Sequence, residues 1–266
     1  MLKNLVILVF ISVFIASCGR YSRVLNKGTI EQQYKLATEL YENEKYEKAI
    51  KLFEKTTKGY EGKPQMERIQ YMISDSYYKT RQYTLSSYYF KRFCENYPNS
   101  SKVEEANYLS ANSYYMLSPV YSLDQTETYE ALSEVQAFID KYPDSEYLPQ
   151  ANEQIKELRY KLEKKAFETA KQYYRIGDYT ASITSFDNLL SDYLGTTFKE
   201  EALYYKFKAS YELAVKSVFS KKEARLKSAV KAYDKLKRNF PESKHLKESD
   251  KLLEDLNKKL SDFILT

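Results

Sequence analysis

Glycine and proline are scarce in this sequence, with six residues of each among 266. A β-sandwich or β-barrel needs many tight turns, and tight turns favour these two residue types. Loops that bind nucleotide phosphates also need several glycines at close spacing. The shortage argues against both classes and favours α-helices that are joined by short connections.

Residues that carry chemistry are also few: the chain has two cysteines, one histidine and no tryptophan. Two cysteines and one histidine do not make up a structural zinc site. A catalytic triad would have to use His245, and no carboxylate pair or glycine-rich loop stands out as an alternative. We therefore predict no enzyme activity, no catalytic residue, no metal and no cofactor. The formal charge of +5 is modest, and no nucleic-acid partner is predicted.

The first residues are typical of an export signal. Lys3 is followed by an uncharged apolar run from Leu5 to Ala16, which is shorter than the roughly 20 residues that a membrane-spanning helix needs. Residues 1–17 are therefore predicted to be a signal peptide that is removed from the mature chain.

The end of this signal, Ile15-Ala16-Ser17-Cys18, resembles the lipobox of bacterial lipoproteins. The resemblance implies that Cys18 becomes the acylated first residue, and two or three acyl chains anchor a protein durably. An ordinary cleaved signal with a free or disulfide-bonded Cys18 is the alternative. Residues 18–28 would then form a lipidated tether that lies on anionic headgroups, or a solvated linker. The basic residues of this tether are Arg20, Arg23 and Lys27.

A repeated pattern runs through the rest of the chain. An aromatic residue precedes Pro98, Pro143 and Pro241, and a small residue stands twelve positions before each of these prolines. Proline ends the preceding helix, and a serine two positions later, such as Ser100, is a good N-cap for the next one. A bulky residue four positions after the small one shares its helical face. The pairs, including two units without the proline, are Ala49 with Phe53, Ser86 with Phe90, Ala131 with Val135, Ser182 with Phe186 and Ala229 with Tyr233.

Helix pairs of about 34 residues with this pattern resemble the tetratricopeptide repeat (TPR). The predicted fold is all-α: an α-solenoid of about five TPR helix pairs, closed by a capping helix from Ser243 to Leu260. Residues 29–144 are predicted to hold units one to three. Residues 145–266 are predicted to hold units four and five with the capping helix.

Two departures from a regular array are also predicted. The apolar pattern continues unbroken between Ser145 and Ile176, which indicates one long helix. Extra residues between the helices of the third and fifth units predict surface loops at Pro119–Gln125 and Ser217–Ala224.

Tyrosines recur in the first helix of each pair at two positions that are seven residues apart. Seven residues are two helical turns, so both positions project from one face. The corresponding face usually lines the concave groove of TPR proteins, and tyrosine offers apolar area and a hydroxyl for peptide backbone. Packing between adjacent repeats is the alternative. The candidates for a client-binding groove are Tyr34, Tyr41, Tyr71, Tyr78, Tyr108 and Tyr115, with Thr38, Asp75 and Asn112 between them.

Charge is sorted along the chain. Residues 104–154 contain ten acidic residues and one lysine, whereas residues 199–238 contain twelve basic and five acidic residues. The basic segment predicts an acidic protein or an anionic membrane surface as partner, although a solvated helix face also explains such a run.

A lipobox followed by about five TPR units, with these insertions and a long helix, resembles the BamD family of lipoproteins in the bacterial β-barrel assembly (BAM) machinery. The resemblance implies a scaffold of the outer membrane that faces the periplasm. It implies that the six tyrosines receive the aromatic-ended targeting strand of unfolded outer-membrane β-barrel proteins. It also implies partners in the other BAM lipoproteins and in a POTRA domain of BamA. Candidates for docking on that domain are Lys206, Lys208 and Arg225 in the basic fifth unit.

The fifth unit departs from the repeat pattern, because Lys208 stands where other units have Ala37, Ala111 and Ala170. Cys94 lies in an expected second helix, where a lone cysteine is more often a small core side chain than a nucleophile. Two other functions stay open: a periplasmic TPR lipoprotein that serves as an adaptor for cell-wall or envelope enzymes, and a glycan-binding lipoprotein, against which the absence of tryptophan argues.

Overall fold

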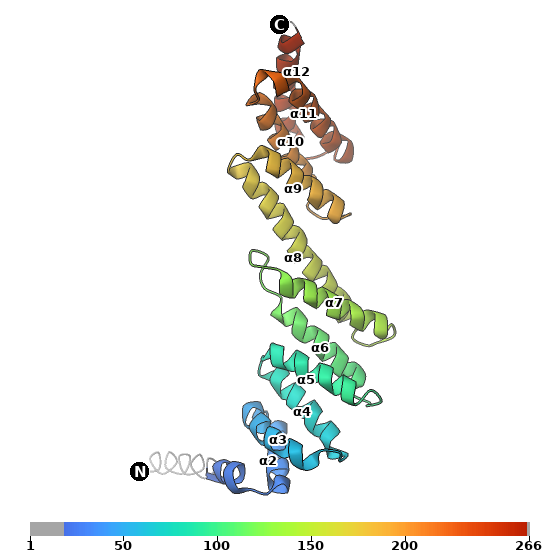
Figure 1. The fold of residues 1–266 in the computed structure, drawn as a ribbon. Helices are drawn as coiled ribbons and strands as arrows, with labels where there is room; N and C mark the ends of the chain where they lie inside the picture. The colour runs from blue at the N-terminus through green and yellow to red at the C-terminus, as the bar shows by residue number, and fades with distance from the viewer. Residues whose placement is uncertain (1–18, 265–266) are drawn as a thin grey trace, which may run out of the picture. The chain divides into compact units, whose positions relative to one another are not determined.

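The computed structural model describes residues 19–264; Cys18 and the predicted signal peptide of residues 1–17 lie outside this range. The described residues form α-helices and connections, with no strand among them. The helices pair in chain order, from α2 with α3 to α10 with α11, and α12 follows (Figure 1). The predicted all-α array of helix pairs with a C-terminal capping helix is confirmed. The helices are α2 (Ile30–Glu42), α3 (Tyr46–Tyr60), α4 (Gln65–Lys79), α5 (Tyr83–Asn96), α6 (Val103–Leu117), α7 (Thr126–Lys141), α8 (Leu148–Arg175), α9 (Tyr179–Asp192), α10 (Lys199–Val215), α11 (Phe219–Asn239) and α12 (Leu246–Ile264).

The chain divides into two compact units. Among the described residues, the first unit holds 19–119 and 125–158, and the second holds 120–124 and 159–264. α8 is the predicted long helix, and it contributes to both units because the boundary falls after Leu158. The sequence-based boundary before Ser145 lies just ahead of this helix.

The small and bulky residues of the repeat form the seams inside the helix pairs. Ala49, Ser86, Ala131, Ser182 and Ala229 are fully buried, and so are the bulky residues four positions later, of which Tyr233 is the most exposed at 2%. A small side chain lets two helices approach closely, and the bulky one fills the space one turn away. The small and bulky residues that alternate in the sequence therefore form the packed interface between the two helices of each pair.

Three tight links inside helix pairs share one backbone geometry. Their middle residues, Glu44, Arg81 and Gly177, have φ values of 58°, 60° and 85°. In each link, the backbone amide of the residue after the middle one donates a hydrogen bond to the carbonyl five residues before it. An example is Gln82 N to Tyr77 O at 2.9 Å. This is the Schellman arrangement that ends helices, and only Gly177 adopts the left-handed backbone without a Cβ. These links therefore reverse the chain direction in the same way between the two helices of three pairs.

Two local predictions are wrong. Residues from Phe219 onward are helical, so most of the predicted loop Ser217–Ala224 is the first part of α11. Its extra residues lengthen a helix, because lysine, glutamate and alanine, which fill positions 221–224, favour helix over loop. Ser100 does not cap α6: the N-cap is Lys102, and Ser100 Oγ instead accepts from Lys102 N at 3.1 Å.

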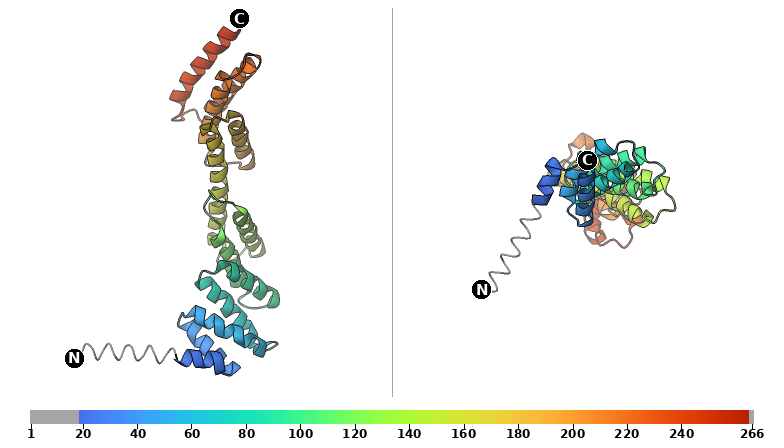
Figure 2. Two further views of the ribbon diagram at one scale, coloured as in Figure 1. Left: turned by 60° about the vertical axis from the view of Figure 1, so that its left-hand side comes forward. Right: turned by 90° about the horizontal axis from the view of Figure 1, so that it is seen from below.

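A short helix over residues 19–27 packs against the first helix pair (Figures 1 and 2). Tyr21, Val24 and Leu25 contact the core cluster of α2, α3 and α4. Gln33 Nε2 donates to the carbonyls of Val24 and Leu25 at 3.3 Å. The segment expected to be a tether is therefore folded onto α2 from residue 19 onward.

Candidate functional site

The second tyrosine of each first helix in the first unit forms a hydrogen bond to the next first helix. Tyr41 Oη of α2 donates to Asp75 Oδ2 of α4 at 2.6 Å. Asn112 Nδ2 of α6 donates to Tyr78 Oη of α4 at 2.5 Å, and Tyr115 Oη donates to Glu157 of α8. These bonds join adjacent repeats, so the predicted residues Asp75 and Asn112 are partners of the tyrosines.

The first tyrosine of each first helix packs by its ring on the second helix. Tyr34 lies 6.4 Å from Phe53 between ring centroids, and Tyr71 lies 5.6 Å from Phe93. Tyr108 packs on Phe138 in the same way and stacks on Tyr147 with centroids 4.3 Å apart. All six tyrosines are half-buried, so each is held by the repeat and still presents part of its surface.

A cavity of about 460 Å³ opens beside two of these six tyrosines, Tyr41 and Tyr71. Met72 and Phe93 supply further apolar surface. The four other predicted tyrosines do not line it, so the structure concentrates the opening at the first two repeats. The complete lining is Tyr41, Glu42, Pro64, Glu67, Arg68, Tyr71, Met72, Phe93 and Lys102. We call it the tyrosine cavity.

Two cations stand in the tyrosine cavity. Lys102 Nζ lies 2.7 Å from Glu105 Oε2 and 5.5 Å from the Tyr71 ring centroid. Arg68 is exposed and its guanidinium lies 3.6 Å from Glu42. Both ion pairs are largely exposed, and such pairs are weak. An incoming carboxylate therefore competes easily for either cation.

Burial shapes the titration of the polar groups beside this cavity. Burial first, and then the neighbouring Glu105 carboxylate, raise the Tyr71 pKa above its ordinary value. Burial also raises the Asp75 pKa, against the hydrogen bond from Tyr41 that lowers it. The tyrosine hydroxyls thus stay protonated near neutral pH, and that of Tyr41 keeps donating its hydrogen bond to Asp75.

Sequence analysis did not single out Arg68, Lys102, Met72 or Phe93. Lys102 belongs to the connection before α6, and Phe93 lies on α5, whereas the tyrosine ladder lies on first helices. Their convergence depends on how neighbouring pairs stack. The only signal in the sequence was the aromatic spacing of Phe93 from Phe90 along one helix.

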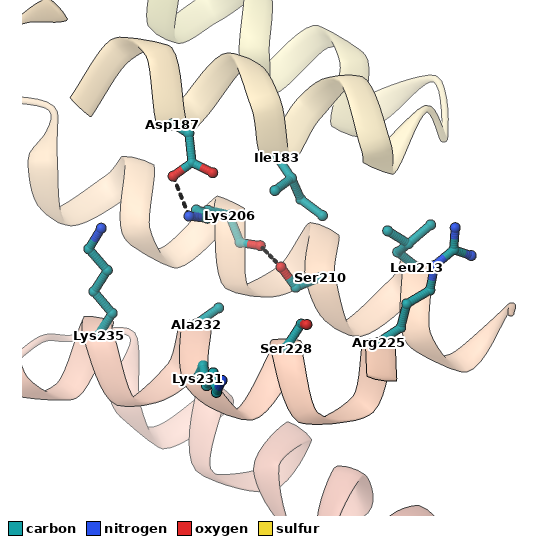
Figure 3. A pocket seen from close by; sticks show the side chains of 10 residues that line it. All are labelled: Ile183, Asp187, Lys206, Ser210, Leu213, Arg225, Ser228, Lys231, Ala232 and Lys235. Atoms are coloured by element: carbon teal, nitrogen blue, oxygen red, sulfur yellow. Dashed lines mark hydrogen bonds and ion pairs between the residues drawn. The ribbon is translucent and has the colours of Figure 1, made fainter. Parts of the chain in front are cut away.

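A second cavity, of about 300 Å³, lies among α9, α10 and α11 in the second unit (Figure 3). Lys206 of α10 forms an ion pair with Asp187 of α9, and the Lys206 side chain is only 16% exposed. Arg225 Nη1 of α11 donates to Ser217 Oγ at 2.7 Å. The lining contains four cations and one carboxylate: Ile183, Asp187, Lys206, Ser210, Leu213, Arg225, Ser228, Lys231, Ala232 and Lys235. We call it the basic cavity.

The basic cavity contains two of the three predicted docking residues, Lys206 and Arg225. Lys208 is not in its lining, and its Nζ lies 2.8 Å from Glu248 Oε1 of α12. Burial disfavours the charged Lys208 side chain, but hydrogen bonds to Glu248 and Tyr204 outweigh this and raise the Lys208 pKa above its ordinary value. Lys208 thus pairs with the capping helix, which explains the lysine at an alanine position of the repeat.

Other chemistry is sparse among residues 19–264. No group of three or more histidine, cysteine or acidic residues is placed to hold a metal ion there. Burial raises the pKa of the half-buried Cys94 thiol to about 11, which makes it a poor nucleophile near neutral pH. Within the same range, no helix combines the length and apolar character that crossing a bilayer requires.

Stacked TPR-type helix pairs with two side-chain-lined cavities place this chain in the class of helical repeat scaffolds. The chain belongs to the outer-membrane lipoprotein family YfiO, whose model matches residues 26–226. YfiO is the BamD family, so the resemblance found in the sequence is confirmed, and so is association with the outer membrane.

No curated protein matches the chain. Among solved structures, one titled "Computational Design of Self-Assembling Cyclic Protein Homooligomers" aligns over 98% of this chain and 97% of its own, at 16% identity. Its TM-score of 0.20 is too low to inform the fold or the function of this chain.

Proposed function

We propose that this chain is a lipid-anchored scaffold of the BAM machinery that binds segments of unfolded outer-membrane β-barrel proteins and docks on BamA. Acylated Cys18 would hold it at the outer membrane, facing the periplasm. It works by binding without catalysis: a membrane-held scaffold raises the effective concentration of its clients beside the insertase. Membership of the YfiO family supports this role.

The tyrosine cavity is the observation that carries the client-binding proposal. Its apolar surface from Tyr71, Met72 and Phe93 suits an aromatic side chain, and Lys102 and Arg68 suit a carboxylate. The last residue of a chain that ends in an aromatic residue offers both groups together. We therefore place the aromatic C-terminal residue of the client in this cavity.

The basic cavity supports the docking proposal. Its four cations outnumber its single carboxylate, and two serine hydroxyls stand among them. An acidic segment of a POTRA domain would complement this charge. The other BAM lipoproteins complete the proposed set of partners.

The carboxylate part of the proposal predicts a difference between two peptides. A peptide from the C-terminal strand of a β-barrel protein, with a free carboxylate, should bind about tenfold more tightly than the same peptide with a C-terminal amide. Lys102→Gln should weaken binding of the free acid and leave binding of the amide nearly unchanged. Fluorescence anisotropy of labelled peptides measures both. Lys35→Gln, on the exposed face of α2, is the matched control. Equal affinity of the wild-type chain for acid and amide would contradict this assignment.

The aromatic part predicts a difference between two tyrosines of the ladder. Tyr71→Ala should weaken both peptides by about tenfold or more, because it removes a wall of the cavity. Tyr108→Ala changes the equivalent residue one repeat further on, outside the cavity, and should have little effect. Circular dichroism of each variant checks that the helices are retained. Equal losses from both substitutions would show that clients bind along the whole ladder instead.

A further inference from the structure

The N-terminal helix over residues 19–27 is held firmly on the first helix pair. Arg20 forms a two-pronged ion pair with Glu39 of α2, at 2.9 and 2.8 Å. Lys55 Nζ of α3 donates to Leu25 O at 2.9 Å, and Lys48 Nζ of α3 lies 5.3 Å from the Tyr21 ring centroid. This helix begins at Gly19, the residue that follows Cys18. An acyl anchor on Cys18 would therefore bring α3 close to the membrane.

α3 carries a row of lysines on the face opposite its core. Lys48, Lys51, Lys55 and Lys58 follow one another at spacings of three, four and three residues, so they share one side of the helix. All four are exposed. The core side of α3 is formed by Ala49, Ile50, Leu52, Phe53 and Thr56.

The N-terminal helix carries two further exposed cations, Arg23 and Lys27. The contacts of Lys48 and Lys55 with Tyr21 and Leu25 place the two helices side by side. Within residues 19–264, none of the six cations forms an ion pair. We call the set of Arg23, Lys27, Lys48, Lys51, Lys55 and Lys58 the basic face.

The nearby carboxylates reduce the charge of the basic face without cancelling it. Glu39 is paired with Arg20. Glu54 lies on the flank of α3 toward α4, where it accepts a hydrogen bond from Tyr77 at 2.7 Å. Glu47, seven residues before Glu54, lies on that same flank. Glu47 and Glu54 stand four residues before Lys51 and Lys58, a spacing at which opposite charges attract. Six cations and two carboxylates therefore leave a net positive charge on these two helices.

We propose that the basic face binds the anionic phospholipid headgroups of the leaflet that holds the lipid anchor. This inference takes the acylation of Cys18 from the proposed function. Two signals then act together: the acyl chains provide attachment, and the basic face fixes how the first helix pair lies against the bilayer. The tyrosine cavity begins on α2 and α4 of the same unit, so its distance from the membrane would be set by this contact.

A lipid surface fits the basic face better than an acidic protein does, for two reasons. Two of its cations, Arg23 and Lys27, stand five and nine residues after Cys18, where the chain would enter the membrane. Its cations are also spread along two helices, whereas the cations of the basic cavity surround an opening in the second unit. Cations that are distributed over a surface can all contact an anionic bilayer at once, and each lysine near the bilayer adds its own share to the binding free energy.

Lysine footprinting on the acylated full chain tests the proposal. The protein is reconstituted into vesicles of phosphatidylglycerol with phosphatidylcholine, or of phosphatidylcholine alone, and treated with an acetylating reagent. Mass spectrometry then reports the reaction rate of each lysine. Lys48, Lys51, Lys55 and Lys58 should react several-fold more slowly on the anionic vesicles, and 1 M salt should remove the difference. Lys247 and Lys251 of α12, both exposed, should react alike on both.

A triple variant gives a second readout. Arg23→Gln, Lys51→Gln and Lys58→Gln together leave the contacts of Lys48 and Lys55 in place. Each lost cation should lower the ratio of bound to detached face by about fivefold, or ~1 kcal/mol, so protection of Lys48 and Lys55 on anionic vesicles should disappear. The control is a triple variant that makes the same charge change on α12: Lys247→Gln, Lys251→Gln and Lys258→Gln. It should preserve the protection of Lys48 and Lys55 on anionic vesicles.

Several outcomes would overturn the proposal. They are equal lysine rates on the two kinds of vesicle, equal slowing of all lysines on the anionic vesicles, unchanged protection in the triple variant, or protection that requires an added protein partner. The mass of the N-terminal peptide from the same samples reports whether Cys18 is acylated. A failure of the lipid anchor is therefore separate from a failure of the basic face.

Discussion

Replacing Phe90 with alanine is expected to lower the free energy of unfolding by about 3–5 kcal/mol. Phe90 is fully buried, in a cluster with Phe93 of α5 and Ala106 of α6. Its ring also meets Tyr71 edge-on, with centroids 5.9 Å apart. Alanine would leave a cavity in the seam of the second repeat, because Ser86 on the same face is too small to fill it.

Urea unfolding followed by circular dichroism measures this effect as a shift of the midpoint. Tyr88→Ala is the matched control, since Tyr88 lies on the same helix but is 55% exposed. Its cost should be under about 1 kcal/mol. Equal shifts for the two variants would mean that Phe90 does not close the helix pair as the structure indicates.

Reversing two charges of the basic cavity is expected to weaken docking on the POTRA region of BamA by roughly 100-fold, since like charges then face each other across the interface. Lys231→Glu with Lys235→Glu is the suitable pair, because both lysines line the cavity and are exposed. Lys206 is a poorer choice, since its loss would leave Asp187 without its partner. Most of the loss should appear as slower association with a weaker dependence on salt.

Surface plasmon resonance with the purified POTRA region measures both the rates and the salt dependence. Lys247→Glu with Lys251→Glu applies the same change of charge to α12 and should reduce affinity only slightly. If the two double variants lose affinity equally, the net charge of the chain matters and the basic cavity is not the docking site.

The fold was predictable in detail because its signals are local. Small and bulky residues four positions apart, such as Ser86 and Phe90, identify a buried helical face wherever they recur. Aromatic-proline steps mark helix ends, as at Tyr97, where α5 stops at Asn96. Each repeat packs mainly on its neighbours, so a pattern within one repeat is enough to predict the array.

The binding surfaces were only partly predictable for the opposite reason. The spacing of Tyr41 and Tyr71 was visible in the sequence, but not that these two line a cavity while Tyr108 stacks on Tyr147. Whether a tyrosine lines a cavity depends on which side chains the neighbouring repeat places beside it. Lys102, for example, contacts the Tyr71 ring from the connection before α6. Lys206 and Lys208 stand two residues apart, yet the structure directs one into a cavity and the other to α12.

The sequence by itself determined the repeat and the side of each helix that is buried, because both follow from residues within one or two helical turns. Tertiary structure alone decided which side chains from different repeats share a cavity. It also decided that residues 19–27 fold onto α2 and α3. Those outcomes depend on the stacking of separate helices, and no short stretch of sequence encodes that stacking.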